Sequence, residues 1–299
     1  MSAQLSTAQA DARPADSAAQ AQASTHAHGT NDHGPLTSKA AAKARPKRFD
    51  ALGLLLPVGA LLTLEVLVWQ GVVPRHMLPP PSDWVITLTQ LGLGTVAEHA
   101  LTSSARVLTG FGLGASLAVL IGALVGLQPL VARLLDPTFQ ALRAIPSLAW
   151  VPLLLLWLGI DEAPKIVLIA IGAFFPVYLG VSSGLRDVDR KLVEVARMAG
   201  LPATALVRRV LLPATAPALM TGLRQGLSLA WMFMVAAELI AASRGLGYLL
   251  TDGRETGRAD LVLSAIVLLA LLGKLTDSLM QWWETRQLAW RDTFDASTR

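Results

Sequence analysis

The sequence lacks cysteine altogether, and this absence excludes disulfide bonds, thiol catalysis and any metal site built on thiolates. Charged side chains are also scarce: Asp, Glu, Lys and Arg make up only 15% of the 299 residues, whereas a soluble domain carries about 25%. No Gly-x-x-x-x-Gly-Lys-Ser/Thr loop is present, so we do not expect this chain to hydrolyse ATP itself. Hydrophobic residues, by contrast, make up 53% of the chain, and this balance indicates a protein that lies in a lipid bilayer.

Long apolar runs predict an all-α, polytopic membrane protein with six transmembrane helices. About 20 helical residues at 1.5 Å each are enough to cover the ~30 Å hydrocarbon layer. The first predicted helix occupies residues 50–70. The third carries Pro146 and Pro152, so we expect a kinked helix whose freed carbonyls are satisfied by its neighbours. The second to sixth helices are expected at about residues 107–127, 138–158, 166–184, 218–242 and 261–280.

Polar segments flank and separate these runs. Residues 1–49 hold few large apolar side chains, which predicts a disordered tail, and they lack the apolar core of a signal peptide. Residues 71–96 form a polar connection. Its Pro-rich part is expected to be extended, and a short surface helix is expected over residues 84–100. Residues 282–299 form a second polar tail.

The distribution of basic residues predicts which side of the membrane each segment faces, because cytoplasmic loops carry an excess of Lys and Arg. If both termini are cytoplasmic, the inner segments hold the larger share of the cations. Topology then accounts for the net charge of +4, and no nucleic-acid partner is expected. The densest basic group falls in one inner loop, at Arg186, Arg190, Lys191, Arg197, Arg208 and Arg209.

That loop contains an Arg-rich polar island, residues 194–213, between two apolar runs. Gly200 is typical of a residue that ends a helix, and Pro202 is typical of the first turn of the next one. We expect Pro213 to close this second helix. The pattern therefore predicts two short amphipathic helices outside the membrane, suited to docking on another protein. Apolar residues recur at helical spacing in the second, namely Leu206, Val207, Val210 and Leu211.

The spacing within this island resembles a known signature, the EAA loop of the permeases of bacterial ABC importers. The pattern is Glu-x-Ala, three residues, Gly, nine residues, a β-branched residue, one more, and Leu-Pro. Val195 and Val210 stand where Ala and Ile are usual. The resemblance implies that this loop is the coupling helix, which lies in a groove of a cytoplasmic ATPase. The matching residues are Glu194, Ala196, Gly200, Leu212 and Pro213.

Further blocks make the resemblance narrower. It extends from about residue 75 to residue 291 and is similar to the permeases for aliphatic sulfonates, within a wider group that also imports taurine and nitrate. Lys165 also belongs to the shared pattern. The blocks that carry the resemblance lie at residues 143–146, 156–162, 175–176, 184–189, 245–248 and 273–277.

The resemblance implies the MetI-like permease fold of type I ABC importers, with the permease domain at residues 97–281. It also implies a bacterial inner-membrane protein that pairs with an identical second copy, docks two ABC ATPase subunits and receives substrate from a periplasmic binding protein. ATP hydrolysis then belongs to a partner, so this chain is not expected to be an enzyme, and neither a cofactor nor a metal is expected. Taurine, nitrate or another small solute is the alternative substrate to an aliphatic sulfonate.

Several charged residues lie inside the predicted spans, where a charge costs about 2.5–3.5 kcal/mol on insertion scales. In one interpretation they line a pathway in which Arg143 or Arg224 meets an anion. In the other, the arginines reach water at the inner face, Glu238 is paired near the outer face, and Lys274 and Asp277 form a local pair. An intramembrane enzyme is the alternative of a different class. It needs paired catalytic groups at depth, whereas the five histidines lie in the N-terminal tail or the outer connection.

Overall fold

The computed structural model describes residues 52–288, and over this range the chain is all-α and contains no strand. The predicted tail at residues 1–49 lies outside the described residues, as do residues 289–299 of the second predicted tail. Within that range, four helices are long and apolar enough to cross a membrane, and a bent pair of helices adds a fifth crossing if it forms one span. The four long helices are α3 (Leu93–Leu127), α6 (Glu162–Arg186), Ala203–Ile240, which includes most of α9 (Leu212–Ala241), and α11 (Ala259–Gln287). The apolar part of α1 (Leu52–Trp69) is shorter than these.

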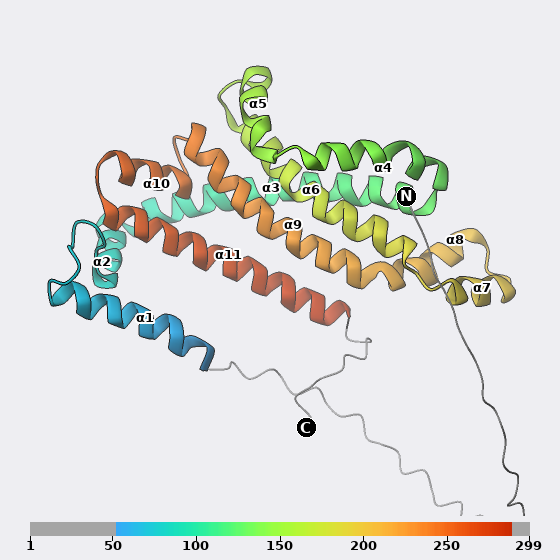
Figure 1. The fold of residues 1–299 in the computed structure, drawn as a ribbon, viewed down its shortest axis with the longest axis horizontal. Helices are drawn as coiled ribbons and strands as arrows, with labels where there is room; N and C mark the ends of the chain where they lie inside the picture. The colour runs from blue at the N-terminus through green and yellow to red at the C-terminus, as the bar shows by residue number, and fades with distance from the viewer. Residues whose placement is uncertain (1–51, 289–299) are drawn as a thin grey trace, which may run out of the picture. The chain divides into compact units, whose positions relative to one another are not determined.

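The core is built around α6, which packs along both α3 and α9 (Figure 1). One cluster joins Ala118 and Val125 of α3 to Val177 of α6. A second cluster joins Ile169 of α6 to Met234 of α9. These residues are almost completely buried, so α6 is the helix against which the other two are positioned.

Glycine allows α6 and α9 to approach closely. A Cβ atom at Gly222 of α9 would lie 2.8 Å from the carbonyl oxygen of Pro176, and one at Gly180 of α6 would lie 2.7 Å from the carbonyl oxygen of Ala218. Neither position has room for a side chain unless the helices separate. Small residues at such crossings let backbones come into van der Waals contact, which drives helix association in a bilayer.

The third predicted span is not one kinked helix, and this prediction is wrong in its details. α4 (Pro129–Ala144) starts earlier than expected and is followed by the 3₁₀-helix η1 (Ser147–Trp150) and by α5 (Val151–Leu158). The two halves meet at 89°. The break falls at Ile145, which is extended (φ −76°, ψ 123°) because a following proline disfavours the helical conformation.

Two short helices, α2 (Pro81–Leu91) and α10 (Leu246–Glu255), pack against α11. The hydroxyl of Thr87 on α2 donates to the Asp260 carboxylate at 2.7 Å. Gly92, with φ 82°, separates α2 from α3, so α3 begins well before the expected residue 107. Hydropathy missed this first part of α3 because several of its polar residues are buried against other helices.

The turn between α1 and α2 is held by side-chain pairs. The Glu65 carboxylate of α1 accepts hydrogen bonds from the backbone N–H of Ser82 at 3.1 Å and from its hydroxyl at 2.7 Å. Arg75 contacts Asp83 at 2.6 Å, and this hydrogen-bonded guanidinium lowers the pKa of Asp83 below its usual range. Glu65 is thus satisfied within the chain although it lies in an apolar helix.

We predict that Gly222→Val destabilises the protein by about 1–3 kcal/mol or more, because the added side chain forces α6 and α9 apart. Gly273→Val on α11 is the matched control, since no atom lies within 4 Å of a Cβ there. The measurement is the midpoint of thermal unfolding of the detergent-solubilised protein. Equal losses in the two variants would contradict the close packing inferred at Gly222.

Candidate functional site

A short element projects from the end of the α6–α9 pair. α7 (Arg190–Met198) and α8 (Ala203–Leu206) lie beyond the ends of α6 and α9 in Figure 1. Asp189 caps α7, because its carboxylate accepts the backbone N–H of Lys191 at 2.9 Å. The residues of the EAA-like pattern therefore occupy a folded connection between two long apolar helices.

Gly200 sets the angle between α7 and α8. The N–H of Leu201 donates to the Ala196 carbonyl at 3.2 Å, and the N–H of Gly200 donates to the Arg197 carbonyl at 2.9 Å. This pair of bonds is the Schellman motif, which places the glycine in the left-handed conformation, here at φ 72°. Ala196 is buried and supplies one of the two carbonyls. The predicted helix stop at Gly200 therefore has a definite backbone geometry.

The prediction that Pro213 closes the second helix is wrong, because the helix continues. α8 leads into a π-helical turn, η2 (Val207–Leu211), and directly into α9. In this turn the N–H of Leu212 donates to the carbonyl of Val207, five residues back. The next residue, Pro213, has no N–H to donate to the carbonyl four residues back. The wider π-helical turn therefore lies where the α-helical hydrogen-bond pattern is interrupted anyway. Residues 203–240 form one helix.

Three apolar side chains are exposed among the charged residues of α7. The side chains of Leu192, Val195 and Met198 are exposed, Met198 to 88%. Glu194 lies beside them and pairs with Arg190 at 2.9 Å, one helical turn away. Exposed apolar side chains on a projecting helix, bordered by charges, are typical of a surface that binds another protein. Leu212 is also exposed and lies at the start of α9.

A buried polar network occupies the opposite end of α9. The Glu238 carboxylate is fully buried and contacts Arg106 of α3 at 2.7 Å. The Ser103 hydroxyl lies 2.8 Å from one Glu238 oxygen, and the backbone N–H of Gly247 donates to the other at 2.7 Å. Glu238 is thus paired, and its carboxylate receives donors from α3 and from the start of α10.

The same arginine joins α6 to this network. Two N–H groups of Arg106 donate to the two oxygens of Glu162 at 2.6 Å each, and Lys165 lies 3.0 Å from Glu162. A further N–H of Arg106 donates to the carbonyl of Arg244 at 2.6 Å. The sequence patterns do not predict this role of Arg106 and Glu162. The available signal was the helical spacing of His99, Ser103 and Arg106 on one face of α3.

The Gly245-Leu-Gly247 turn fits closely over Glu238. Gly245 has φ 121°, and its N–H donates to Nδ1 of His99 at 3.0 Å. A Cβ atom at Gly247 would lie 2.5 Å from the Cβ atom of Glu238. Both glycines are therefore required by the close approach of the backbone to the buried side chain, and the turn is a structural part of the network.

A second group of charged residues lies between α9 and α11. Arg224 donates to both oxygens of Asp277, at 2.6 and 3.0 Å, and lies 3.8 Å from Glu284. Lys274 lies 3.7 Å from Asp277. Arg224 is thus engaged by two carboxylates, and this contact ties the two helices together.

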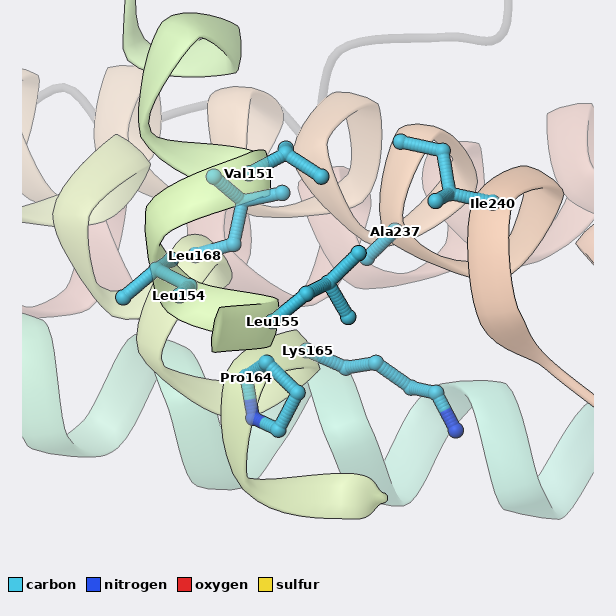
Figure 2. A pocket seen from close by; sticks show the side chains of 8 residues that line it. All are labelled: Val151, Leu154, Leu155, Pro164, Lys165, Leu168, Ala237 and Ile240. Atoms are coloured by element: carbon cyan, nitrogen blue, oxygen red, sulfur yellow. The ribbon is translucent and has the colours of Figure 1, made fainter. Parts of the chain in front are cut away.

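The hollow drawn in Figure 2 is too small for a substrate. It lies between α5, α6 and α9 and has a volume of about 10 Å³, close to the space that one water molecule needs. Leu154, Leu155 and Ala237 make its wall apolar, and the amine of Lys165 lies away from them. Within residues 52–288, no group of three or more potential metal-ligating side chains comes together.

A larger polar cavity, of about 270 Å³, lies between α4 and α6. Arg143 lines it, together with Asp136, Tyr178 and Arg186. The carboxylate of Asp136 accepts hydrogen bonds from the Tyr178 hydroxyl at 2.7 Å and from Arg186 at 2.6 Å. The five charged residues expected inside spans therefore fall in three places: the Glu238 network, the α9–α11 contact of Arg224, Lys274 and Asp277, and this cavity with Arg143.

We predict that Glu238→Ala lowers stability by about 3–5 kcal/mol, because it leaves the buried Arg106 with an unpaired part of its guanidinium. The control is Glu98→Ala, which removes an exposed pair with Arg244 at 3.2 Å and is expected to cost less than about 1 kcal/mol. Thermal unfolding in detergent measures both. A midpoint for Glu238→Ala equal to that of the control would show that the network does not stabilise the fold.

Comparison with known proteins identifies the family. The family described as "Binding-protein-dependent transport system inner membrane component" matches residues 111–288. The aliphatic sulfonates transport permease protein SsuC of Bacillus subtilis (strain 168) is 40% identical over 265 residues, which cover 87% of this chain and 96% of that protein. The protein of the same name from Escherichia coli (strain K12) is 41% identical over 80% of this chain and 91% of its own length.

A solved chain of the MetNI methionine ABC transporter has the same fold, with a TM-score of 0.55 at 20% identity over 65% of this chain and 94% of that chain. The apolar spans and these relatives make this chain a multi-pass membrane protein and a transport component, not an enzyme. Its family implies an ATPase and a substrate-binding protein as partners. The chain belongs to the binding-protein-dependent transport system inner membrane components, as the permease subunit of an ABC importer.

Proposed function

We propose that this permease carries aliphatic sulfonates across the bacterial inner membrane and that a separate ATPase drives it through α7 and α8. The likeness to proteins named as aliphatic sulfonate permeases supports this choice of substrate. Taurine, nitrate or another small solute is the alternative, because the blocks that resemble sulfonate permeases are shared within that wider group. The observation that carries the mechanism is the continuity of α8, η2 and α9.

The proposed coupling site consists of Glu194, Ala196, Gly200, Leu212 and Pro213 with the exposed surface of α7. Residues 203–240 form one helix, about 57 Å long at 1.5 Å per residue, so α8 and α9 move together when α8 is pushed. The Schellman turn at Gly200 fixes α7 relative to α8. An ATPase that binds the exposed Met198 and Val195 therefore acts directly on a transmembrane helix.

The proposed complex contains two identical permease copies, two ATPase subunits and one periplasmic binding protein. Both termini are cytoplasmic in this arrangement, and so is the α7–α8 element. The excess of Lys and Arg in residues 186–209 supports that orientation, because cytoplasmic loops are enriched in these residues. The pairing of identical copies is carried over from the resemblance to ABC importer permeases.

The test of substrate and coupling is ATP-driven uptake into proteoliposomes that contain the permease, its ATPase and its binding protein. We expect uptake of alkanesulfonates and little uptake of taurine or nitrate. Gly200→Val is expected to reduce both uptake and substrate-stimulated ATP hydrolysis at least tenfold, because a β-branched side chain is disfavoured in the left-handed conformation by at least about 1–2 kcal/mol and misdirects α7.

The matched control is Gly200→Asn, since asparagine tolerates this conformation and no atom lies within 4 Å of a Cβ at this position. It is expected to retain most activity. Normal coupling in a well-expressed Gly200→Val variant would defeat the proposed role of the turn. Preferred uptake of nitrate or taurine would replace the proposed substrate.

The orientation can be tested with single cysteines, because the natural sequence has none. We predict that Arg197→Cys resists a membrane-impermeant maleimide in intact cells and reacts after the membrane is opened. Met77→Cys, on the connection between α1 and α2, is expected to react in cells whose outer membrane is permeabilised while the inner membrane stays closed. Labelling of Arg197→Cys from outside would reverse the proposed topology.

A further inference from the structure

Arg143 differs from the paired arginines of the helical bundle. Arg106, Arg186 and Arg224 each meet a carboxylate oxygen at 2.6 Å. Arg143 has no carboxylate oxygen within 4.0 Å among the described residues, and its side chain is exposed on the wall of the polar cavity. A guanidinium carries five N–H donors in a planar fork, so this group has unused capacity for an anion.

Arg143 lies near the middle of the helical bundle along the direction of α6. It lies one helical turn beyond Phe139, whose ring centroid is 5.5 Å from that of Phe174 and 4.9 Å from that of Tyr178. Phe174 is at the middle of α6, about 18 Å from either end at 1.5 Å per residue. Arg143 is therefore level with the central part of a span rather than with its inner end.

The charges around the polar cavity leave Arg143 as its available cation. Arg186 and the Tyr178 hydroxyl both bind Asp136, so those groups satisfy one another. Asp187, the other carboxylate on the wall, is the residue that caps the end of α6, so it is far along the helix from the level of Phe174. Gln140 lies on the wall near Arg143 and offers a further amide donor.

An apolar cavity of about 470 Å³ adjoins the polar one, because both are lined by Phe139 and Phe175. Leu117 of α3 and Trp150 of η1 are among its other lining residues. The polar cavity contains the unpaired cation and the neighbouring cavity is almost wholly hydrocarbon. Their chemistry is complementary to a molecule with an anionic head and an aliphatic tail.

We propose that the two cavities form one transit site for an alkanesulfonate, with the sulfonate on Arg143 and the alkyl chain between α3, α4 and α6. This inference rests on the proposed function and adds a site and a basis for selectivity. Nitrate has no tail for the apolar cavity. Taurine would place an ammonium group there, and a charge in an apolar environment is strongly disfavoured.

The experiment measures ligand-induced thermal stabilisation of the permease–ATPase complex in phosphatidylcholine nanodiscs without the binding protein. Hexanesulfonate is expected to bind at least tenfold more tightly than ethanesulfonate, because each buried methylene strengthens binding about fourfold. Hexylammonium, with the same tail and the opposite charge, is expected not to stabilise the complex. Arg143→Gln should weaken hexanesulfonate binding at least tenfold. Arg133→Gln on the same helix, outside the cavity, should leave it unchanged.

A second pair of variants tests the tail. Leu117→Trp partly fills the apolar cavity and should weaken hexanesulfonate binding at least threefold while sparing ethanesulfonate. Leu120→Trp on the same helix is the control, because that exposed residue does not line the cavity. Equal affinities for the two sulfonates, or an unchanged affinity in Arg143→Gln, would overturn the proposal.

An anionic lipid is the competing source of the same chemistry. Stabilisation by phosphatidylglycerol that depends on Arg143, without any response to hexanesulfonate, would assign the site to lipid and overturn the proposal. The uptake assay separates this inference from the proposed function. Alkanesulfonate uptake with no dependence on Arg143 would reject only the site, whereas binding at Arg143 without alkanesulfonate uptake would reject only the function.

Discussion

The arrangement of the helices depends on the burial of one carboxylate, that of Glu238. A charge removed from water destabilises a protein unless it is paired and hydrogen-bonded, so this side chain requires specific partners. They come from separate segments: Arg106 and Ser103 of α3, and the backbone of Gly247 at the start of α10. Arg106 in turn holds Glu162 at the start of α6. One charge therefore fixes α3, α6, α9 and α10 at a common end, where apolar packing alone would permit sliding.

Because the Glu238 end of α9 is fixed, the packing near its other end, where α8 joins it, decides how α9 can move. α9 is continuous with α8 through a π-helical turn, and it contacts α6 so closely that Gly180 and Gly222 cannot carry side chains. Arg224 joins it to α11. In the proposed coupling, a force on α8 would therefore act on a packed group of helices and not on one flexible segment. Because packed interfaces are not continuously deformable, such a group responds by rigid-body displacement.

Sequence alone predicted the helical class, the apolar runs and the end of α7 at Gly200, because each has a local cause in hydropathy or backbone conformation. It failed where the cause lies elsewhere in the chain. Pro213 predicts a helix end because proline lacks an N–H, yet the π-helical turn before it lets the helix continue. The second span was predicted to begin at about residue 107, although α3 begins at Leu93 and Arg106 is buried there by carboxylates 56 and 132 residues away. The spacing of His99, Ser103 and Arg106 marks one polar face of α3, but it does not identify partners so far away in the sequence.

The same limit explains why sequence could not distinguish the arginines of the spans. Arg143 and Arg224 have equal intrinsic charge, and only their surroundings differ. Arg224 is engaged by two carboxylates, so an incoming anion would have to displace a pair that is already formed. Arg143 has no carboxylate oxygen within 4.0 Å among the described residues and lies beside a cavity, so an anion at the proposed transit site would meet only one charged partner. A transporter needs a site of this kind, because binding must be favourable enough for the solute to enter and weak enough for it to leave.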